Sequence, residues 1–322
     1  MWRTRPIHGI IAGLMMLLAH GSALAADTSA PIRLIVPTPP GSASDALARA
    51  MSAPWGKASG HAIVVENVAG AGTTIGTRQL ARASRDGLTL GVISSNHTIN
   101  PWLYKNLPYD PISDFTPIAM IGSVPAMLVA NNNLAASTPA ELIQLSRSAP
   151  KPLAEGVVTG TAYHMASEVF KEQAGITTNP IPYKGSTQVI NDLIGGNLDI
   201  AFVAAQAVAP LVAAGKLKAL AVTSPIRSDM APQVPTLRES GLPKYDVDVW
   251  LAIAGPGGLA ADQVAARRKE IEAALADPDM KNAMQKQGVQ PIRMEQAQIA
   301  PFMKQELERN RAVIQRVGIS VE

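Results

Sequence analysis

The chain has 322 residues, of which 47% are hydrophobic, and it carries a formal net charge of +3 at pH 7. A charge this close to zero excludes a broad basic surface for nucleic acid or anionic lipid. Because the sequence contains no cysteine, it also excludes a disulfide framework and a lipid anchor on cysteine.

Residues 1–25 have the pattern of a secretory signal peptide. Arg3 and Arg5 form a basic start, an apolar core covers 10–19, and Ala23-Leu24-Ala25 is an A-x-A cleavage site. The apolar core is too short to span a bilayer. We therefore expect an exported protein, most simply periplasmic, that is cleaved near Ala25. It keeps roughly 300 residues, which is enough for two domains.

Short apolar strands then alternate with amphipathic helical patterns, which predicts an α/β fold of largely parallel sheets flanked by helices. In the first half the expected strands are 32–36, 61–67 and 88–93, and the expected helices begin near 42 and span about 75–83. The expected loops are the polar stretch 94–97 and the Pro- and Asp-rich stretch 100–117, before an extended apolar segment at 118–130.

Past Asn131 the pattern of strands and helices restarts, and Thr138-Pro139 with Glu141 is a strong helix start. Further strands are expected at 154–158, 180–183, 198–203, 217–223 and 247–254, with a last helix at about 296–316. The restart and the later return predict two lobes joined by a two-stranded hinge, which permits closure around a ligand between them. The predicted boundaries are 27–125 plus 245–322 for lobe 1 and 126–244 for lobe 2.

The stretch 31–50 reads as a strand that runs through prolines and Gly41 into a helix. Ser42 and Asp45 form a start that resembles a capping box. The free N–H groups of a first helical turn, together with the helix dipole, favour an anion. A well-capped strand-turn-helix unit without a ligand is an equally good interpretation of this stretch alone.

Lobe 2 offers two matching helix starts, Gly160-Thr161 and Tyr183-Lys184-Gly185-Ser186. Because ligands of open α/β sheets bind beyond the carboxyl ends of strands, these turns and the first one are expected to converge on an anionic group. Lys184 is the candidate for an ion pair, although a lysine beside a glycine turn more often faces solvent.

The sequence lacks the motifs of dinucleotide binding, metal binding and serine hydrolysis. The glycines at 70, 72 and 76 are spaced one residue too widely for a dinucleotide fingerprint, and tight turns explain them. The histidines have no metal spacing, and no G-x-S-x-G elbow is present. A ligand contact and a structural role stay equally open for His97 and for His164.

A series of short motifs follows in order along the mature chain. They are the P-x-P-P-G-x-x-x-D opening at 37–45, then 65–67, 70–72, 75–76, 86–87, 100–105, 107–111, 114–117, Gly160-Thr161 with His164, 182–186, Gly195-Gly196 with Asp199, 234–236, Glu239 and 241–242. With these motifs the chain resembles the Bug family, the TctC-type solute-binding proteins of tripartite tricarboxylate transport.

The resemblance implies a two-lobed periplasmic binding protein, without cofactor or catalysis, that passes a small carboxylate to a membrane permease of two subunits (TctA/TctB-like). It also implies that backbone groups of 41–45 and 183–186 hold the carboxylate. The alternative partner is a membrane sensor kinase, to which the protein would present its bound ligand. The alternative to a binding protein is an exported enzyme. We expect a monomer.

The sequence departs from the family at three positions. Thr38 stands where an aromatic residue is usual, Ser42 where a second glycine is usual, and Val203 where an acid is frequent. These departures favour a plain mono- or dicarboxylate over an aromatic acid or an amino acid. The candidate ligand-binding residues are Thr38, Gly41, Ser42, Ala43, Ser44, Asp45, Ser95, Gly160, Thr161, His164, Tyr183, Lys184, Gly185, Ser186 and Val203.

Overall fold

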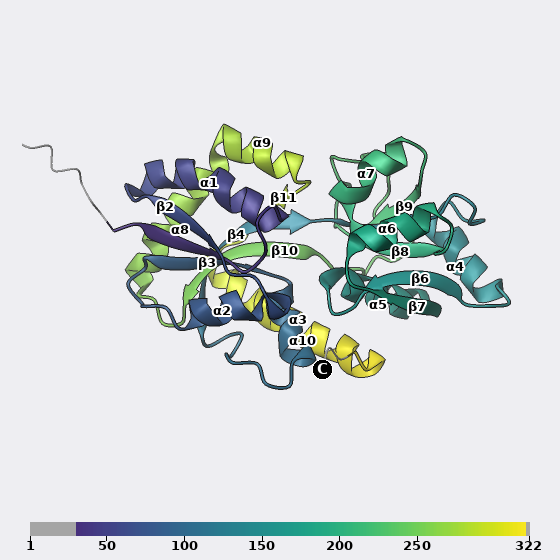
Figure 1. Cartoon of the computed structure of the whole chain (residues 1–322), viewed down its shortest axis with the longest axis horizontal. Helices are drawn as coiled ribbons and strands as arrows, with labels where there is room; N and C mark the ends of the chain where they lie inside the picture. The colour runs from purple at the N-terminus through teal and green to yellow at the C-terminus, as the bar shows by residue number, and fades with distance from the viewer. Residues whose placement is uncertain (1–29, 320–322) are drawn as a thin grey trace, which may run out of the picture.

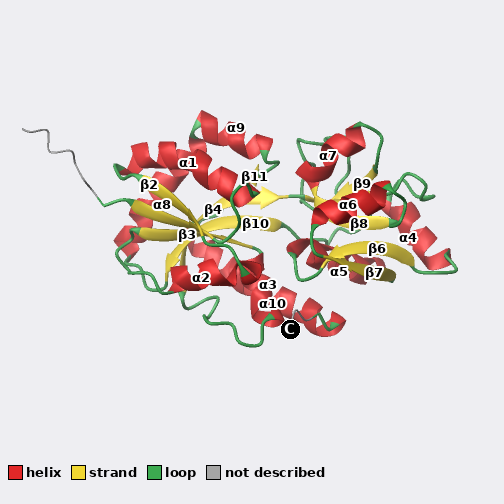
Figure 2. Ribbon diagram, viewed as in Figure 1, coloured by secondary structure: helices red, strands yellow, loops and turns green. Residues whose placement is uncertain are grey.

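The computed structural model describes residues 30–319, so the predicted signal peptide lies outside the described residues. Figure 1 shows two lobes side by side, each built on one β-sheet with helices around it, and Figure 2 separates the strands from the covering helices. Within 30–319, no helix combines the length and the apolar character that a bilayer crossing requires.

The first lobe contains a six-stranded sheet with the order β11-β4-β10-β3-β1-β2. β1 lies parallel to β2 and β3, whereas β10 lies antiparallel to β3 and β4, so the returning strand makes this sheet mixed. Its strands are β1 (Ile32–Val36), β2 (Ile63–Asn67), β3 (Thr89–Ser94), β4 (Phe115–Val124), β10 (Val249–Pro256) and β11 (Gln290–Pro291). Its helices are α1 (Ala43–Ser59), η1 (Ala71–Thr73), α2 (Thr74–Ala81), α3 (Asn96–Leu103), α8 (Ala261–Ala276), α9 (Pro278–Lys286) and α10 (Gln296–Val317).

The second lobe contains a five-stranded sheet with the order β7-β6-β8-β5-β9. β6 lies parallel to β7 and β8, while β5 lies antiparallel to β8 and β9. Its strands are β5 (Ala126–Ala130), β6 (Leu153–Val158), β7 (Thr178–Tyr183), β8 (Ile200–Ala204) and β9 (Lys218–Val222). Its helices are α4 (Pro139–Ser148), α5 (Ala162–Ala174), α6 (Ser186–Ile194) and α7 (Ala205–Ala213).

The chain crosses between the sheets twice. Pro125 separates β4 from β5, and the segment 223–248 leads from β9 back to β10. Residues 124–126 and 248–249 are the points at which the chain passes from one lobe to the other. We call the facing sides of the two lobes at these points the seam. The crossings agree with the predicted two-stranded connection, while the precise lobe boundaries stay a prediction.

The predicted loops at 94–97 and 100–117 are partly wrong. Helix α3 covers Asn96–Leu103, which includes the end of the first predicted loop and the start of the second. Pro101 lies inside this helix and removes one backbone donor, which is why the sequence reads as a breaker. Burial outweighs that loss, since Ile99 and Leu103 are 1% and 4% exposed in the core of the second lobe.

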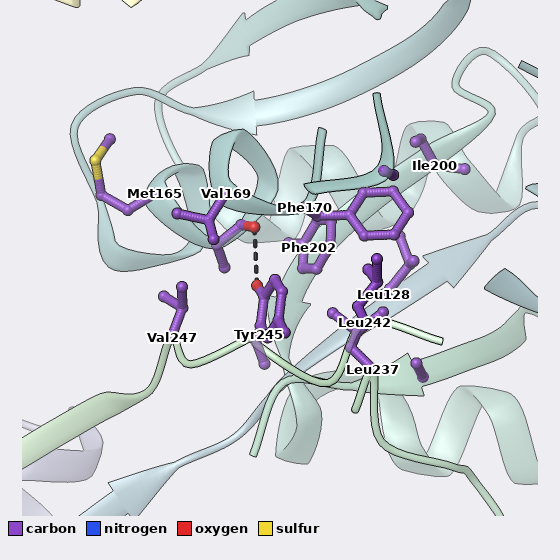
Figure 3. Packing of buried hydrophobic residues seen from close by; sticks show 14 of the residues in the cluster. Leu128, Met165, Val169, Phe170, Ile200, Phe202, Leu237, Leu242, Tyr245 and Val247 are labelled. Carbon is purple, nitrogen blue, oxygen red and sulfur yellow. Dashed lines mark hydrogen bonds between the residues drawn. The ribbon is translucent and has the colours of Figure 1, made fainter. Parts of the chain in front are cut away.

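Tyr245 anchors the returning segment to the second lobe. Its ring is fully buried between α5 and the strands, beside Phe170 and Leu242, and its hydroxyl donates to the Ala166 carbonyl at 2.8 Å (Figure 3). Burial raises the pKa of Tyr245 well above its ordinary value. The segment that leads back to β10 is thus held before it reaches the hinge.

The C-terminal helix α10 joins the two lobes. Its first half packs Ile299 and Met303 on the sheet of the first lobe. Its second half buries Val313 and Ile314 in the core of the second lobe, and Arg316 forms an ion pair with Glu172 of α5 at 2.5 Å. A third connection therefore accompanies the two strand crossings.

Candidate functional site

Strand pairing places three strand-to-helix turns at the seam. The end of β3 pairs with the start of β10 (Ser94 with Leu251), and β1 runs parallel to β3, so β1 also ends at the seam. In the second lobe the end of β8 pairs with the start of β5 (Ala204 with Ala126), and β6 and β7 run parallel to β8. The turns that begin α1, α5 and α6 therefore face each other across the seam (Figure 1).

The first turn begins α1 as the sequence predicts. The Ser42 hydroxyl accepts from the Asp45 N–H at 3.3 Å and lies 2.7 Å from the Thr38 hydroxyl. Gly41 is exposed with φ +82°, a conformation that suits glycine. The N–H groups of Ala43 and Ser44 meet no acceptor in the described part of the chain, and both residues are partly exposed.

The Asp45 carboxylate is occupied within this turn. One oxygen accepts from the Gly41 N–H at 2.9 Å, and the other accepts from Arg49 at 2.9 Å and from Asn67 at 3.0 Å. Burial would raise the pKa of Asp45, but these hydrogen bonds outweigh it and hold the pKa below its ordinary value. Asp45 is 4% exposed, so its observed contacts are those of a group that shapes the turn.

The second turn begins α5. The Thr161 hydroxyl caps it by accepting from the His164 N–H at 3.3 Å. The His164 ring then accepts the Gly160 N–H on Nδ1 at 3.3 Å, and its Nε2 lies 3.4 Å from a Glu168 oxygen. Nδ1 is thus an acceptor, which places the ring proton on Nε2 toward Glu168. The backbone N–H groups of Ala162 and Tyr163 find no acceptor among residues 30–319.

A buried polar network continues from His164 along α5. Lys171 contacts Glu168 at 2.5 Å and Glu155 of β6 at 3.3 Å, and Glu155 accepts from Ser167 and, at 2.6 Å, from Thr178. Burial would raise the Glu168 pKa, yet hydrogen bonds from His164 and Lys171 keep it below its ordinary value. Because every carboxylate in it has a partner, the network fixes the second turn to the lobe core.

The third turn begins α6 without a side-chain cap. Gly185 is the N-cap, in an extended conformation, and the N–H groups of Ser186 and Thr187 meet no acceptor within the described chain. The Tyr183 hydroxyl donates to Asp192 at 2.5 Å, which raises the pKa of Tyr183. Lys184 is exposed, as is usual for a lysine beside a glycine turn.

Two candidate residues lie near the seam but are buried. Ser95 is 3% exposed, and its hydroxyl donates to the Asp248 carbonyl at 3.2 Å and accepts from the Trp250 N–H at 2.9 Å, so it ties β3 to β10. Val203 is 1% exposed and packs with Val189 and Leu193 under α6. In this structure Val203 offers no surface to a ligand.

His97, whose role the sequence leaves open, is buried with Phe115 against its ring at 4.5 Å. Its Nε2 lies 2.7 Å from the Pro111 carbonyl, and burial lowers the pKa of His97 to about 4. The structure therefore gives His97 a place in the core, where it is neutral.

Sequence reasoning missed a further segment at the seam, the connection after β2. Gly70, Ala71, Gly72 and Thr73 all have positive φ, and two of these are not glycine, which stores backbone strain. Asn100 braces the turn by donating to the Gly72 carbonyl at 2.7 Å. The close helix–strand packing expected from the glycines holds for Gly76, where a Cβ would lie 2.6 Å from the Val68 carbonyl.

Residues 47–319 match the family described as TctC, the tripartite tricarboxylate transporter family receptor. The chain belongs to this family. Its members are periplasmic solute-binding proteins rather than enzymes, and they bind small ligands and work with membrane permease components. The family expected from the motifs and the two-lobed fold are thus confirmed.

Relatives cover this TctC-type receptor over most of its length. Protein BugT of Bordetella pertussis is 33% identical over 93% of this chain and 93% of its own length. The R. palustris protein Rpa4515, solved with adipate, has a TM-score of 0.75 and 28% identity over 90% of this chain and 98% of its own. MatC from Rhodopseudomonas palustris, solved with bound malate, has a TM-score of 0.72 and 26% identity over 88% and 98%.

Proposed function

We propose that this TctC-type receptor captures a small mono- or dicarboxylate at the seam, on the N–H groups that begin α1, α5 and α6. The observation that carries the proposal is the set of unpaired donors at these three helix starts, two in each of Ala43-Ser44, Ala162-Tyr163 and Ser186-Thr187. Helix starts favour anions through both their free donors and their dipole.

The number of donors is adequate for a useful affinity. Hydrogen bonds to a charged group contribute roughly 1.5–3 kcal/mol each, and a partly buried helix end contributes up to about 2 kcal/mol. Three or four such contacts reach the roughly 8 kcal/mol of a micromolar ligand before the cost of association. The ligand therefore needs no ion pair with Lys184, which lies exposed beside the third turn.

The ligand class is supported by the composition of the turns and by two relatives. Thr38 provides no aromatic surface for stacking, and Val203 provides no acid for an amino group. Adipate and malate, named in the structures of two relatives, are both dicarboxylates. We extend this class to the present receptor, together with cleavage near Ala25, a monomeric state and delivery to a tripartite tricarboxylate-type permease.

A thermal-shift panel of carboxylates, amino acids and sugars tests the ligand class. A ligand present at 100 times its dissociation constant adds about 2.7 kcal/mol of stability, which raises the melting temperature by a few degrees. We expect shifts with carboxylates such as malate and adipate alone. Shifts confined to sugars would contradict the proposed anion site, and shifts confined to amino acids would contradict the proposed ligand class.

A further inference from the structure

A concave site away from the three turns lies on the first lobe, between α2 and the strands β1 and β3. It has a volume of about 480 Å³, and all three charged residues that line it are arginines: Arg33, Arg78 and Arg82. Gln79, Ser84 and Thr89 add polar side chains to its wall. Such a lining suits an anion with several oxygen atoms.

This basic pocket is separate from the seam. Arg33 and Thr89 lie at the starts of β1 and β3, and these parallel strands reach the seam at their other ends. Figure 1 shows the start of β1, in purple, at the outer end of the lobe. A ligand here would contact none of the three turns described above.

The pocket holds two uncompensated positive charges. Glu66 neutralises Arg33 through two hydrogen bonds of 2.8 and 2.7 Å. Arg78 and Arg82 are exposed, and their guanidinium groups meet no carboxylate within residues 30–319. Arg78 lies in the last turn of α2 and Arg82 is its C-cap, so each charge favours the helix dipole, while the two charges repel each other at a four-residue spacing.

The nearest acid along the chain does not balance the pair. Asp86 follows the polar wall of the pocket, but its carboxylate accepts the Leu88 N–H at 2.8 Å and does not line the pocket. The local excess of positive charge therefore stands on a protein whose overall charge is close to neutral.

We propose that the basic pocket binds a phosphate group, supplied either as free phosphate or as a lipid headgroup. Inorganic phosphate carries about −1.5 to −2 charges near pH 7, which matches the two unpaired arginines, whereas the phosphodiester of a phosphatidylglycerol headgroup carries a single negative charge. Guanidinium forks donate pairs of hydrogen bonds to the oxygens of a tetrahedral phosphate, and Gln79 and Ser84 supply further polar groups. A single carboxylate has fewer oxygens and less negative charge than phosphate, so it cannot satisfy both arginines as well.

Isothermal titration with inorganic phosphate at pH 7.5 tests the pocket, with the protein purified after expression of the full chain. The double variant Arg78→Gln/Arg82→Gln is expected to bind phosphate at least tenfold more weakly than the wild type. The control is Arg85→Gln, an exposed arginine nearby that does not line the pocket, and it is expected to bind within twofold.

The same three proteins are then sedimented with phosphatidylglycerol vesicles and with phosphatidylcholine vesicles at 0.1 M NaCl. Vesicle binding that the double variant loses and Arg85→Gln keeps assigns the phosphate to a lipid headgroup, whereas titration alone assigns it to free phosphate. Absence of both kinds of binding, or equal loss in Arg85→Gln, overturns the proposal. Each titration is repeated with malate in excess. Phosphate binding that malate removes and the double variant keeps belongs to the seam, whereas phosphate binding that malate leaves and the double variant loses belongs to the basic pocket.

Discussion

Replacement of Ser186 by proline isolates one backbone donor of the proposed carboxylate site. Ser186 is the first residue of α6, a position at which proline is well tolerated because its N–H has no partner within the helix. The preceding Gly185 has φ −173° and ψ 158°, an extended conformation that a following proline favours. The variant should therefore fold while it loses one N–H at the seam.

The expected loss follows from the strength of a single bond to a charged acceptor. Such a hydrogen bond contributes roughly 1.5–3 kcal/mol, so the dissociation constant of the bound carboxylate should rise by about 10- to 150-fold. Isothermal titration with the carboxylate found in the thermal-shift panel measures this change. Urea unfolding of the same protein should give a free energy within about 0.5 kcal/mol of the wild type.

Ser186→Ala is the matched control, because it removes the hydroxyl and keeps the N–H. It should bind within a few-fold of the wild type. If Ser186→Pro is folded and binds as tightly as the wild type, the donor at the start of α6 does not hold the ligand and the helix-end geometry is refuted.

Three further predictions concern stability. Tyr245→Phe removes the buried hydrogen bond to Ala166 and should lower the free energy of unfolding by about 1 kcal/mol, against about 3–5 kcal/mol for Tyr245→Ala, both measured in urea. His97 has its folded pKa lowered to about 4 from 6.5, so the unfolded chain takes up a proton first as pH falls. Between pH 7.5 and 4.5 this should remove about 2.5 kcal/mol of stability, a loss that His97→Gln lacks; an equal loss in both proteins would contradict it. Asp45→Asn should destabilise the protein by about 1–3 kcal/mol at pH 7. Because the folded pKa of Asp45 is lowered, its contribution is present above the ordinary aspartate range and is lost as pH falls through the folded pKa, so the gap between variant and wild type should close in acid.

Local signals in the sequence predicted the helix starts well. Ser42, Thr138 and Thr161 each accept a hydrogen bond from the backbone N–H three residues later, as N-caps do. These contacts join residues that are close along the chain, so composition and spacing are sufficient to predict them. The repeated order of strands and helices likewise predicts an α/β fold.

Only the tertiary structure decides what surrounds a residue. α3 is helical although Pro101 reads as a breaker, because burial of its other residues outweighs the lost donor. Val203 lies in the core, and Ser95 joins β3 to β10, because sheet register sets the direction of each side chain.

The sequence by itself therefore determined the fold class, the family and the three helix starts. The tertiary structure decided that these starts share one seam, and that Asp45 binds Asn67 from a strand 22 residues away. It also decided that α10 connects both lobes. The physical reason is range: a cap is complete within one turn of helix, whereas a seam or a pocket arises when sheets bring distant segments together.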